Sequence, residues 1–204
     1  MTLLPVHLVQ FALGAVAAVG IALTVTQPRL RALSALLAMS VSWMVFNFLE
    51  EVVGLREVWL VSPAFRLLYP ALIYLVVRSM IRSGPALTRQ DWPHGVPALV
   101  ALFLTPQIGL VEHAARFSVL AYSAASIWQI HRFHQSTRQT RSDAQTIKLT
   151  GVMLLIGFYL ADSVFDMIRM DALWLRPAWP WLGSQSAYLF QLTLSLVFVC
   201  VLIF

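Results

Sequence analysis

Charged residues are scarce in this sequence. Only 11% of its 204 residues are Asp, Glu, Lys or Arg, whereas a soluble domain carries about 25%. Cysteine occurs once, at Cys200, which excludes an intrachain disulfide and a metal site built from several cysteines. Lysine also occurs once, at Lys148. Because Lys148 precedes an apolar stretch rather than lying deep within one, a retinal-type Schiff base is not expected.

Apolar residues are abundant instead, at 59% of the chain, with a mean hydropathy of +0.77. This composition is typical of an integral membrane protein. A span needs about 20 residues, so the chain has room for about seven helices and no sizeable soluble domain. The sequence thus predicts an all-α, polytopic membrane helix bundle as a single domain. Its helices are expected at about 5–25, 32–53, 59–81, 94–106, 108–133, 147–169 and 182–204.

The fourth of these segments is short and bracketed by prolines. We expect it to be tilted, irregular or partly interfacial. Five spans would remain if this segment and a neighbour formed a re-entrant hairpin. The preceding stretch RSGPALTRQDWPHG is expected to be a loop because of its Gly-Pro and Trp-Pro pairs.

The distribution of basic residues predicts the orientation. One group of loops and helix ends carries Arg29, Arg31, Arg78, Arg82, Arg89, Arg132, Arg138, Arg141 and Lys148. The opposite group carries only Arg56, Arg169 and Arg176. The positive-inside rule then places the amino terminus outside and the carboxyl terminus inside. The net charge of +5 is explained by this orientation, so no direct contact with nucleic acid is expected.

Two carboxylates, Asp162 and Asp166, interrupt the apolar segment 147–169. Their four-residue spacing places them on one helix face. An Asp within a membrane costs roughly 2.5–3.5 kcal/mol at the helix centre, so such residues usually face a protein interior or a water-filled cavity. At about 1.5 Å per residue, Asp162 falls in the outer third of the membrane, and Arg66 and Arg116 lie about 10–12 Å from the outer side. The inner halves of the spans carry almost no charge.

Ionisable and polar side chains from several helices therefore fall in one outer layer. Pairs of Arg66 or Arg116 with Asp162, Asp166 or Glu50 are expected. Two interpretations stay open: ion pairs that only lock the bundle, or an outward-facing pocket for a small polar or charged molecule. The candidate ligand-binding residues are Asn47, Glu50, Glu51, Arg66, Tyr69, Glu112, His113, Arg116, Tyr159, Asp162, Asp166, Gln185 and Tyr188.

Enzyme and transport functions are alternatives that use the same carboxylates. Divalent metal ligands could come from His7, Glu50, Glu51, His113, Asp162 and Asp166, but the last helix lacks the histidine pair expected of a seven-helix membrane zinc hydrolase. Ser184 and Ser186 have no histidine near them in sequence, which disfavours a serine hydrolase. A small transporter would also place charges in its spans, although no inverted repeat is evident. We expect no cofactor.

Seven tryptophans mostly fall near the predicted membrane interfaces. Interfacial anchoring is the expected role of Trp43, Trp59, Trp92, Trp128, Trp174, Trp179 and Trp181. The run PAWPW at 177–181 is the exception, because it borders the predicted pocket.

Three stretches resemble a known family. The runs YPALIYLVVRS at 69–79 and DWPHGVPAL at 91–99, with the later IWQIHRFHQSTRQTRSDAQ after Tyr122, are similar to the amino-terminal membrane domain of bacterial AraC-type transcriptional regulators. Related membrane modules precede sensor kinases. The resemblance implies a seven-helix sensor of the bacterial cytoplasmic membrane, whose carboxyl end leads to a cytoplasmic DNA-binding or kinase domain. Neither a helix-turn-helix nor a kinase motif is present, so we expect the output domain to lie outside this chain.

The interpretation that follows is a receptor that recognises an extracytoplasmic small molecule. Its partners would be the lipid bilayer and that ligand, with a homodimer left open. Binding would change the charge pairing around Asp162 and Arg116 and shift the last two helices.

Overall fold

The chain is all-α in its computed structural model, which describes residues 5–81, 86–104, 107–137, 143–171, 179, 181 and 184–203. Within these residues there are seven α-helices and no strand. The helices are α1 (Pro5–Thr24), α2 (Arg31–Phe48), α3 (Ser62–Ile81), α4 (Val96–Ala101), α5 (Ile108–Thr137), α6 (Asp143–Asp171) and α7 (Gln185–Ile203). Shorter helical turns are η1 (Pro28–Leu30), η2 (Leu49–Val53), η3 (Leu55–Glu57) and η4 (Arg89–Gly95).

The fourth segment departs most from its expected bounds. Helical structure begins at Arg89 rather than near residue 94, within a stretch expected to be a loop, and ends at Ala101. A capping box explains the early start: Thr88 and Asp91 bond reciprocally to each other's backbone. Pro93 and Pro97 do not prevent the helix, because η4 is a 3₁₀ helix and Pro97 lies in the first turn of α4.

The long polar stretch between the fifth and sixth segments is also more helical than expected. Helix α5 continues to Thr137, four residues beyond the expected end, and α6 begins at Asp143, four residues before the expected start. Gln and Arg are good helix formers, so the polar composition predicted the end of the apolar span but not the end of the helix.

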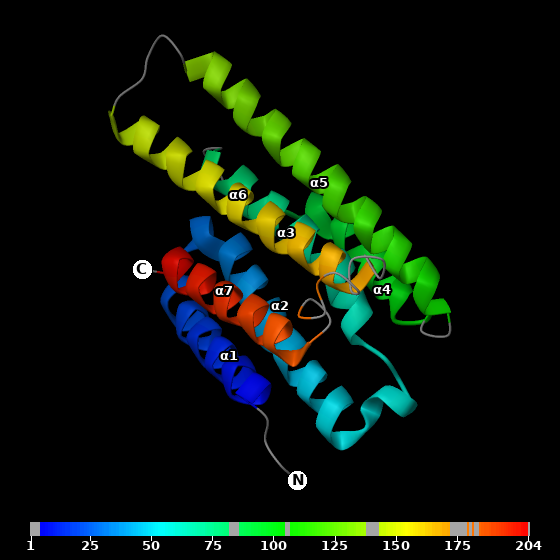
Figure 1. Cartoon of the computed structure of the whole chain (residues 1–204). Coiled ribbons are helices and arrows are strands. Elements are labelled where there is room, and N and C mark those ends of the chain that lie inside the picture. The colour runs from blue at the N-terminus through cyan, green and yellow to red at the C-terminus, as the bar shows by residue number, and fades with distance from the viewer. Residues whose placement is uncertain are drawn as a thin grey trace.

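Six of the helices form a closed ring (Figure 1). Around it, α1 packs against α2, α2 against α3, α3 against α5, α5 against α6, α6 against α7, and α7 against α1. Helix α4 packs on α3. Ala98 and Ala101 of α4 share a small apolar cluster with Ala64 and Leu67 of α3 and with Val111 and Ala115 of α5.

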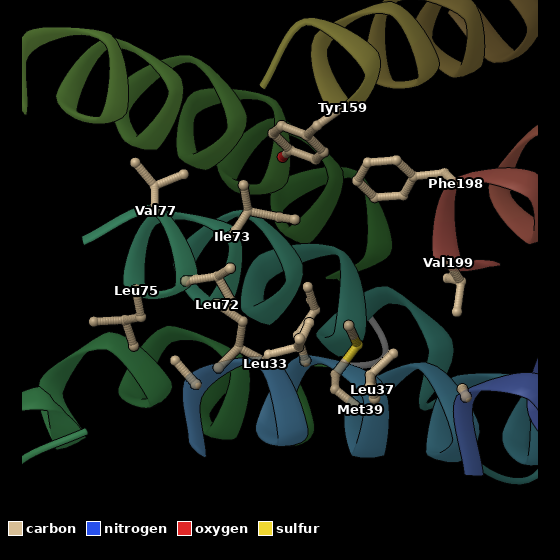
Figure 2. Close-up of a cluster of buried hydrophobic side chains, with 14 of the residues drawn as sticks. Leu33, Leu37, Met39, Leu72, Ile73, Leu75, Val77, Tyr159, Phe198 and Val199 are labelled. Atoms are coloured by element: carbon tan, nitrogen blue, oxygen red, sulfur yellow. The ribbon is translucent and has the colours of Figure 1, made fainter. Parts of the chain in front are cut away.

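The main apolar core lies where the helices of the ring meet. Figure 2 shows Leu33, Leu37 and Met39 of α2, Leu72, Ile73, Leu75 and Val77 of α3, Tyr159 of α6, and Phe198 and Val199 of α7. Phe158 of α6 also stacks on Phe198, with ring centroids 4.7 Å apart and nearly parallel planes. These contacts join the first, middle and last parts of the chain in one core.

Among the residues that the structure describes, three segments are long and apolar enough to cross a membrane: Pro5–Thr24, Pro28–Val53 and Ser62–Ile81. A shorter apolar helix covers Gln185–Cys200. Large apolar side chains are exposed on helices beyond these three, including Phe117 of α5 at 73% and Leu154 of α6 at 69%. Many exposed apolar side chains on several helices suit a lipid environment better than water.

Candidate functional site

A cavity of about 490 Å³ is lined by the six helices of the ring. Five of them each turn one face toward it, and α1 contributes Leu13. Lining residues recur at the three- and four-residue spacing of a single helix face. They include Ser40, Trp43, Met44 and Asn47 of α2; Arg66, Tyr69 and Pro70 of α3; Glu112, Ala115, Arg116 and Val119 of α5; Tyr159, Asp162, Ser163 and Asp166 of α6; and Tyr188, Gln191, Leu192, Ser195 and Val199 of α7.

The cavity has a charged, exposed end and an apolar, buried end. Glu51, Arg56 and Ile108 line it and are exposed. Leu13 and Leu192, which also line it, are buried in the core. A small molecule would therefore enter past charged groups and meet aliphatic side chains further in.

Ion pairs are arranged on the wall of this cavity. Arg66 Nη2 of α3 lies 3.6 Å from Asp166 Oδ2 of α6. Within α5, Arg116 Nη2 lies 4.0 Å from Glu112 Oε2, and Arg116 Nη1 is 3.1 Å from His113 Nδ1. The Arg66–Asp166 pair is among the pairings expected from sequence, and it links two helices that are far apart in the chain.

Glu50 has a structural role at the cavity wall. Its Oε1 accepts hydrogen bonds from the backbone N–H groups of Val61 at 2.6 Å and Ser62 at 2.8 Å, where α3 begins. The first N–H groups of a helix have no partner within the helix and form its positive end. The buried Glu50 carboxylate thus caps α3 and is already occupied by its own chain.

Aromatic rings form a continuous part of the wall. The ring centroids of Trp43 and Tyr69 lie 6.0 Å apart, and those of Tyr69 and Tyr159 lie 5.4 Å apart. Trp43, for which interfacial anchoring was expected, lines the cavity and stacks on Phe65. The sequence did carry a signal for this placement. Trp43 lies four residues from the candidate Asn47, and its partner Phe65 lies four residues from the candidate Tyr69.

The structure brings most of the thirteen candidate residues together. All of them line the cavity except His113 and Gln185. His113 is exposed because it is rotated by about 100° along α5 from Glu112. Gln185 is exposed at the first position of α7.

Small polar residues of the wall were missed by the sequence analysis. They are Ser40, Ser62, Ser163, Gln191 and Ser195, together with the exposed Arg56. Uncharged residues in an apolar helix give a weak signal by themselves. Their spacing from recognised candidates was informative, since Gln191 and Ser195 follow Tyr188 by three and seven residues.

The proposed metal ligands do not converge. In the part of the chain that the structure describes, no group of three or more His, Cys, Asp or Glu side chains could hold a metal ion. His7 pairs instead with Glu51, its Nε2 lying 3.5 Å from Oε2.

The two tryptophans of the PAWPW run, Trp179 and Trp181, do not line the cavity. Trp181 contacts Phe165 and Phe190 instead.

A second polar cluster lies outside the cavity wall, where α3 ends and η4 begins. Arg78 donates from Nη1 to Asp91 Oδ1 and from Nη2 to Asp91 Oδ2, each at 2.7 Å. The Thr88 backbone N–H and hydroxyl donate to Asp91 Oδ2 at 2.7 and 2.9 Å. The Arg78 guanidinium, followed by the Thr88 donors, holds the pKa of Asp91 well below its ordinary value.

Comparison of the chain with protein-family models, curated proteins and solved structures finds no match. Functional inference therefore rests on the chemistry and placement of the cavity.

Proposed function

We propose that this chain is a membrane-embedded receptor domain that binds a small extracytoplasmic molecule in the cavity inside the helix ring and signals to a cytoplasmic output. The cavity is the observation that carries this proposal. Its volume of about 490 Å³ falls within the roughly 300–1,000 Å³ typical of small-molecule sites. If the ion pairs only held the helices together, their side chains would fill the space between the helices. The Arg66–Asp166 pair instead borders an open cavity.

The proposed setting is a bacterial cytoplasmic membrane crossed by seven helical segments, with the amino terminus outside. Three segments have the length and hydropathy of spans. Exposed apolar side chains on α5 and α6 support extending this assignment to them. Charges within a membrane usually face the bundle interior or a cavity, and Arg66, Arg116 and Asp162 all do so here.

Signalling would proceed through α6 and α7. Helix α6 is tied to α3 by the Arg66–Asp166 ion pair and to α7 by the stacked rings of Phe158 and Phe198. A ligand that competes for the charged side chains of the cavity would weaken the Arg66–Asp166 ion pair and move α6 together with α7. It can shift this equilibrium only by its differential affinity for the two arrangements. The family resemblance suggests a DNA-binding or kinase domain as the recipient.

Cysteine labelling tests access to the cavity. Cys200→Ser removes the single cysteine, and Ser163→Cys then places a thiol on the cavity wall. In sealed right-side-out membrane vesicles, a membrane-impermeant thiol reagent should label this position from outside. The matched control is Ser136→Cys near the end of α5, which should be labelled only after the membrane is opened. Labelling of the Ser163→Cys chain from the inner side alone would contradict the proposal.

The same thiol provides a binding assay. Small molecules that occupy the cavity should slow its labelling, and Asp162→Asn or Arg116→Ala should remove this protection while the protein still inserts. Unchanged protection in both variants would rule out the assigned roles of these residues. Counterflow of the protective compound into proteoliposomes would instead indicate a transporter.

A further inference from the structure

We propose that the exposed face of α5 at Trp128 and Arg132 binds the headgroup of an anionic phospholipid from the inner leaflet of the membrane. The inference rests on the membrane setting of the proposed function, because it takes the ends of α3 and α5 as the inner side. It concerns a surface outside the cavity. The lipid site and the cavity can therefore be tested separately.

One face of α5 is exposed and apolar along the middle of the helix. Its residues follow one another at steps of three and four, and they are Phe117, Ala121, Ala124 and Trp128. Phe117 is 73% exposed and Trp128 is 57% exposed. At about 1.5 Å per residue, the distance between them along the axis is about 16 Å. The hydrocarbon layer of one leaflet is about 15 Å thick, so this face matches the acyl chains of a single lipid.

The contact between α5 and α3 places Trp128 near the inner boundary of the membrane. Gln129 Nε2 donates to Tyr74 OH at 2.7 Å, so this part of α5 is level with Tyr74. Arg132 is one turn further along α5, as Arg78 in the last turn of α3 is one turn beyond Tyr74. Trp is enriched at the membrane interface, and Arg side chains direct their charge toward the headgroups.

The guanidinium of Arg132 is held in position by the ring of Trp128. Its Cζ lies over this ring, 4.9 Å from the centroid. Arg132 is exposed and has no carboxylate partner among the described residues. The N–H donors directed away from the ring are therefore available, and a guanidinium can bind a phosphate through two parallel hydrogen bonds.

The charge at this end of the bundle favours an anionic headgroup over a zwitterionic one. Exposed guanidinium groups without a carboxylate partner in the described chain lie at the inner ends of three segments, at Arg29, Arg31, Arg89 and Arg132. Basic groups near the membrane surface attract anionic lipids. An acidic protein surface would suit this charge but would not use the apolar face that leads to Arg132. A lipid uses both.

Native mass spectrometry of the detergent-solubilised chain tests this assignment. The probes are phosphatidylglycerol and phosphatidylethanolamine with identical acyl chains, so that they differ only in the headgroup. We expect the parent chain to bind phosphatidylglycerol more tightly. Arg132→Gln should weaken this binding about fivefold, the factor that one Arg near an anionic surface contributes. Arg132→Lys keeps the charge and should weaken it less.

Arg89→Gln is the matched control, because it removes one charge from the same end of the bundle but from η4. It should weaken binding of phosphatidylglycerol much less than Arg132→Gln does. Equal losses in the two variants would show a diffuse surface charge and would overturn the site.

Two further outcomes would also overturn the lipid assignment. Equal binding of both lipids by the parent chain would favour an acidic protein surface as the partner of this end. Displacement of phosphatidylglycerol by an equal concentration of glycerol 3-phosphate would assign the site to a soluble phosphate. Both outcomes leave the labelling of the Ser163→Cys thiol from outside unaffected, so the proposed function is decided independently.

Discussion

The carboxylate of Asp91 has a different environment from those in the cavity. Only 7% of its side chain is exposed, against 17% for Arg78, and both its oxygens accept from that guanidinium. A bidentate pair of this kind is strong and specific in direction. It ties the end of α3 to the start of η4 and thereby fixes the path of the fourth segment along α3.

Replacing Asp91 should therefore destabilise the protein. Asp91→Asn leaves Arg78 without its countercharge, and we expect the free energy of unfolding at neutral pH to fall by on the order of 3 kcal/mol. Unfolding of the detergent-solubilised protein by sodium dodecyl sulfate measures this. Glu57→Gln, at an exposed carboxylate of η3, is the control and should change little. An equally small effect of both substitutions would contradict the structural role of Asp91.

The same pair predicts a pH dependence. The folded-state pKa of Asp91 is lowered from its ordinary value of 3.8 by the Arg78 guanidinium. A lowered carboxyl pKa stabilises the folded state fully above the unfolded value, and this contribution is lost as pH falls toward the folded value. The melting temperature should therefore decline below about pH 4 more steeply in the parent protein than in Asp91→Asn. Parallel declines in the two proteins would contradict this assignment.

Among the helices, α3 begins in an unusual way. Its first N–H groups are capped by Glu50, which is 11 and 12 residues earlier in the chain. The turn that makes this possible contains the π-helical η2 and then Gly54 at φ +84°. Glycine adopts this left-handed conformation without the strain imposed by a side chain. The end of α2 and the start of α3 are therefore built as one unit at the cavity wall.

Substitutions at Glu50 should separate capping from charge. Glu50→Ala removes both hydrogen bonds and should lower the free energy of unfolding by about 2 kcal/mol. Glu50→Gln retains an acceptor oxygen and should cost less. Unfolding in sodium dodecyl sulfate again provides the measurement. Equal losses would show that the negative charge, rather than the hydrogen bonds, stabilises the start of α3.

For the whole molecule, closure of the ring depends on the contact of its first and last helices. A side chain added at Gly20 of α1 would come within 2.5 Å of Ile203 Cδ1 and 2.7 Å of Leu37 Cδ1. Gly20 thus permits close approach of α1 to both α2 and α7, as small residues do between membrane helices. The cavity lies inside the closed ring, so its shape depends on this contact.

Enlarging Gly20 should loosen the ring. Gly20→Leu should lower the free energy of unfolding by about 1–3 kcal/mol through overpacking, and should also weaken ligand protection of the Ser163→Cys thiol. Gly14→Leu is the matched control, since a Cβ atom there would have only Met44 Cβ within 4.0 Å. Equal effects at the two glycines would argue against a special role for the α1–α7 contact.

Much of the fold was predictable because hydropathy is a local property. Low charge and long apolar runs predicted an all-helical chain and placed its main helices close to their observed positions. The fourth segment is short and irregular, as expected, but the early start of its helical structure was missed because prolines were given more weight than the capping box at Thr88 and Asp91. Trp43 was not recognised as a cavity residue, because the sequence alone does not show which way its helix face points.

The sequence by itself determined the helices and the layer in which polar side chains gather, because rise per residue and four-residue spacing fix depth and face. Tertiary structure alone decided which of those groups meet. It joined Arg66 to Asp166 across nearly 100 residues, assigned Glu50 to the start of α3, and turned His113 and Gln185 away from the cavity. These outcomes depend on which helices are neighbours in the ring and how each is rotated, and packing among distant segments determines both.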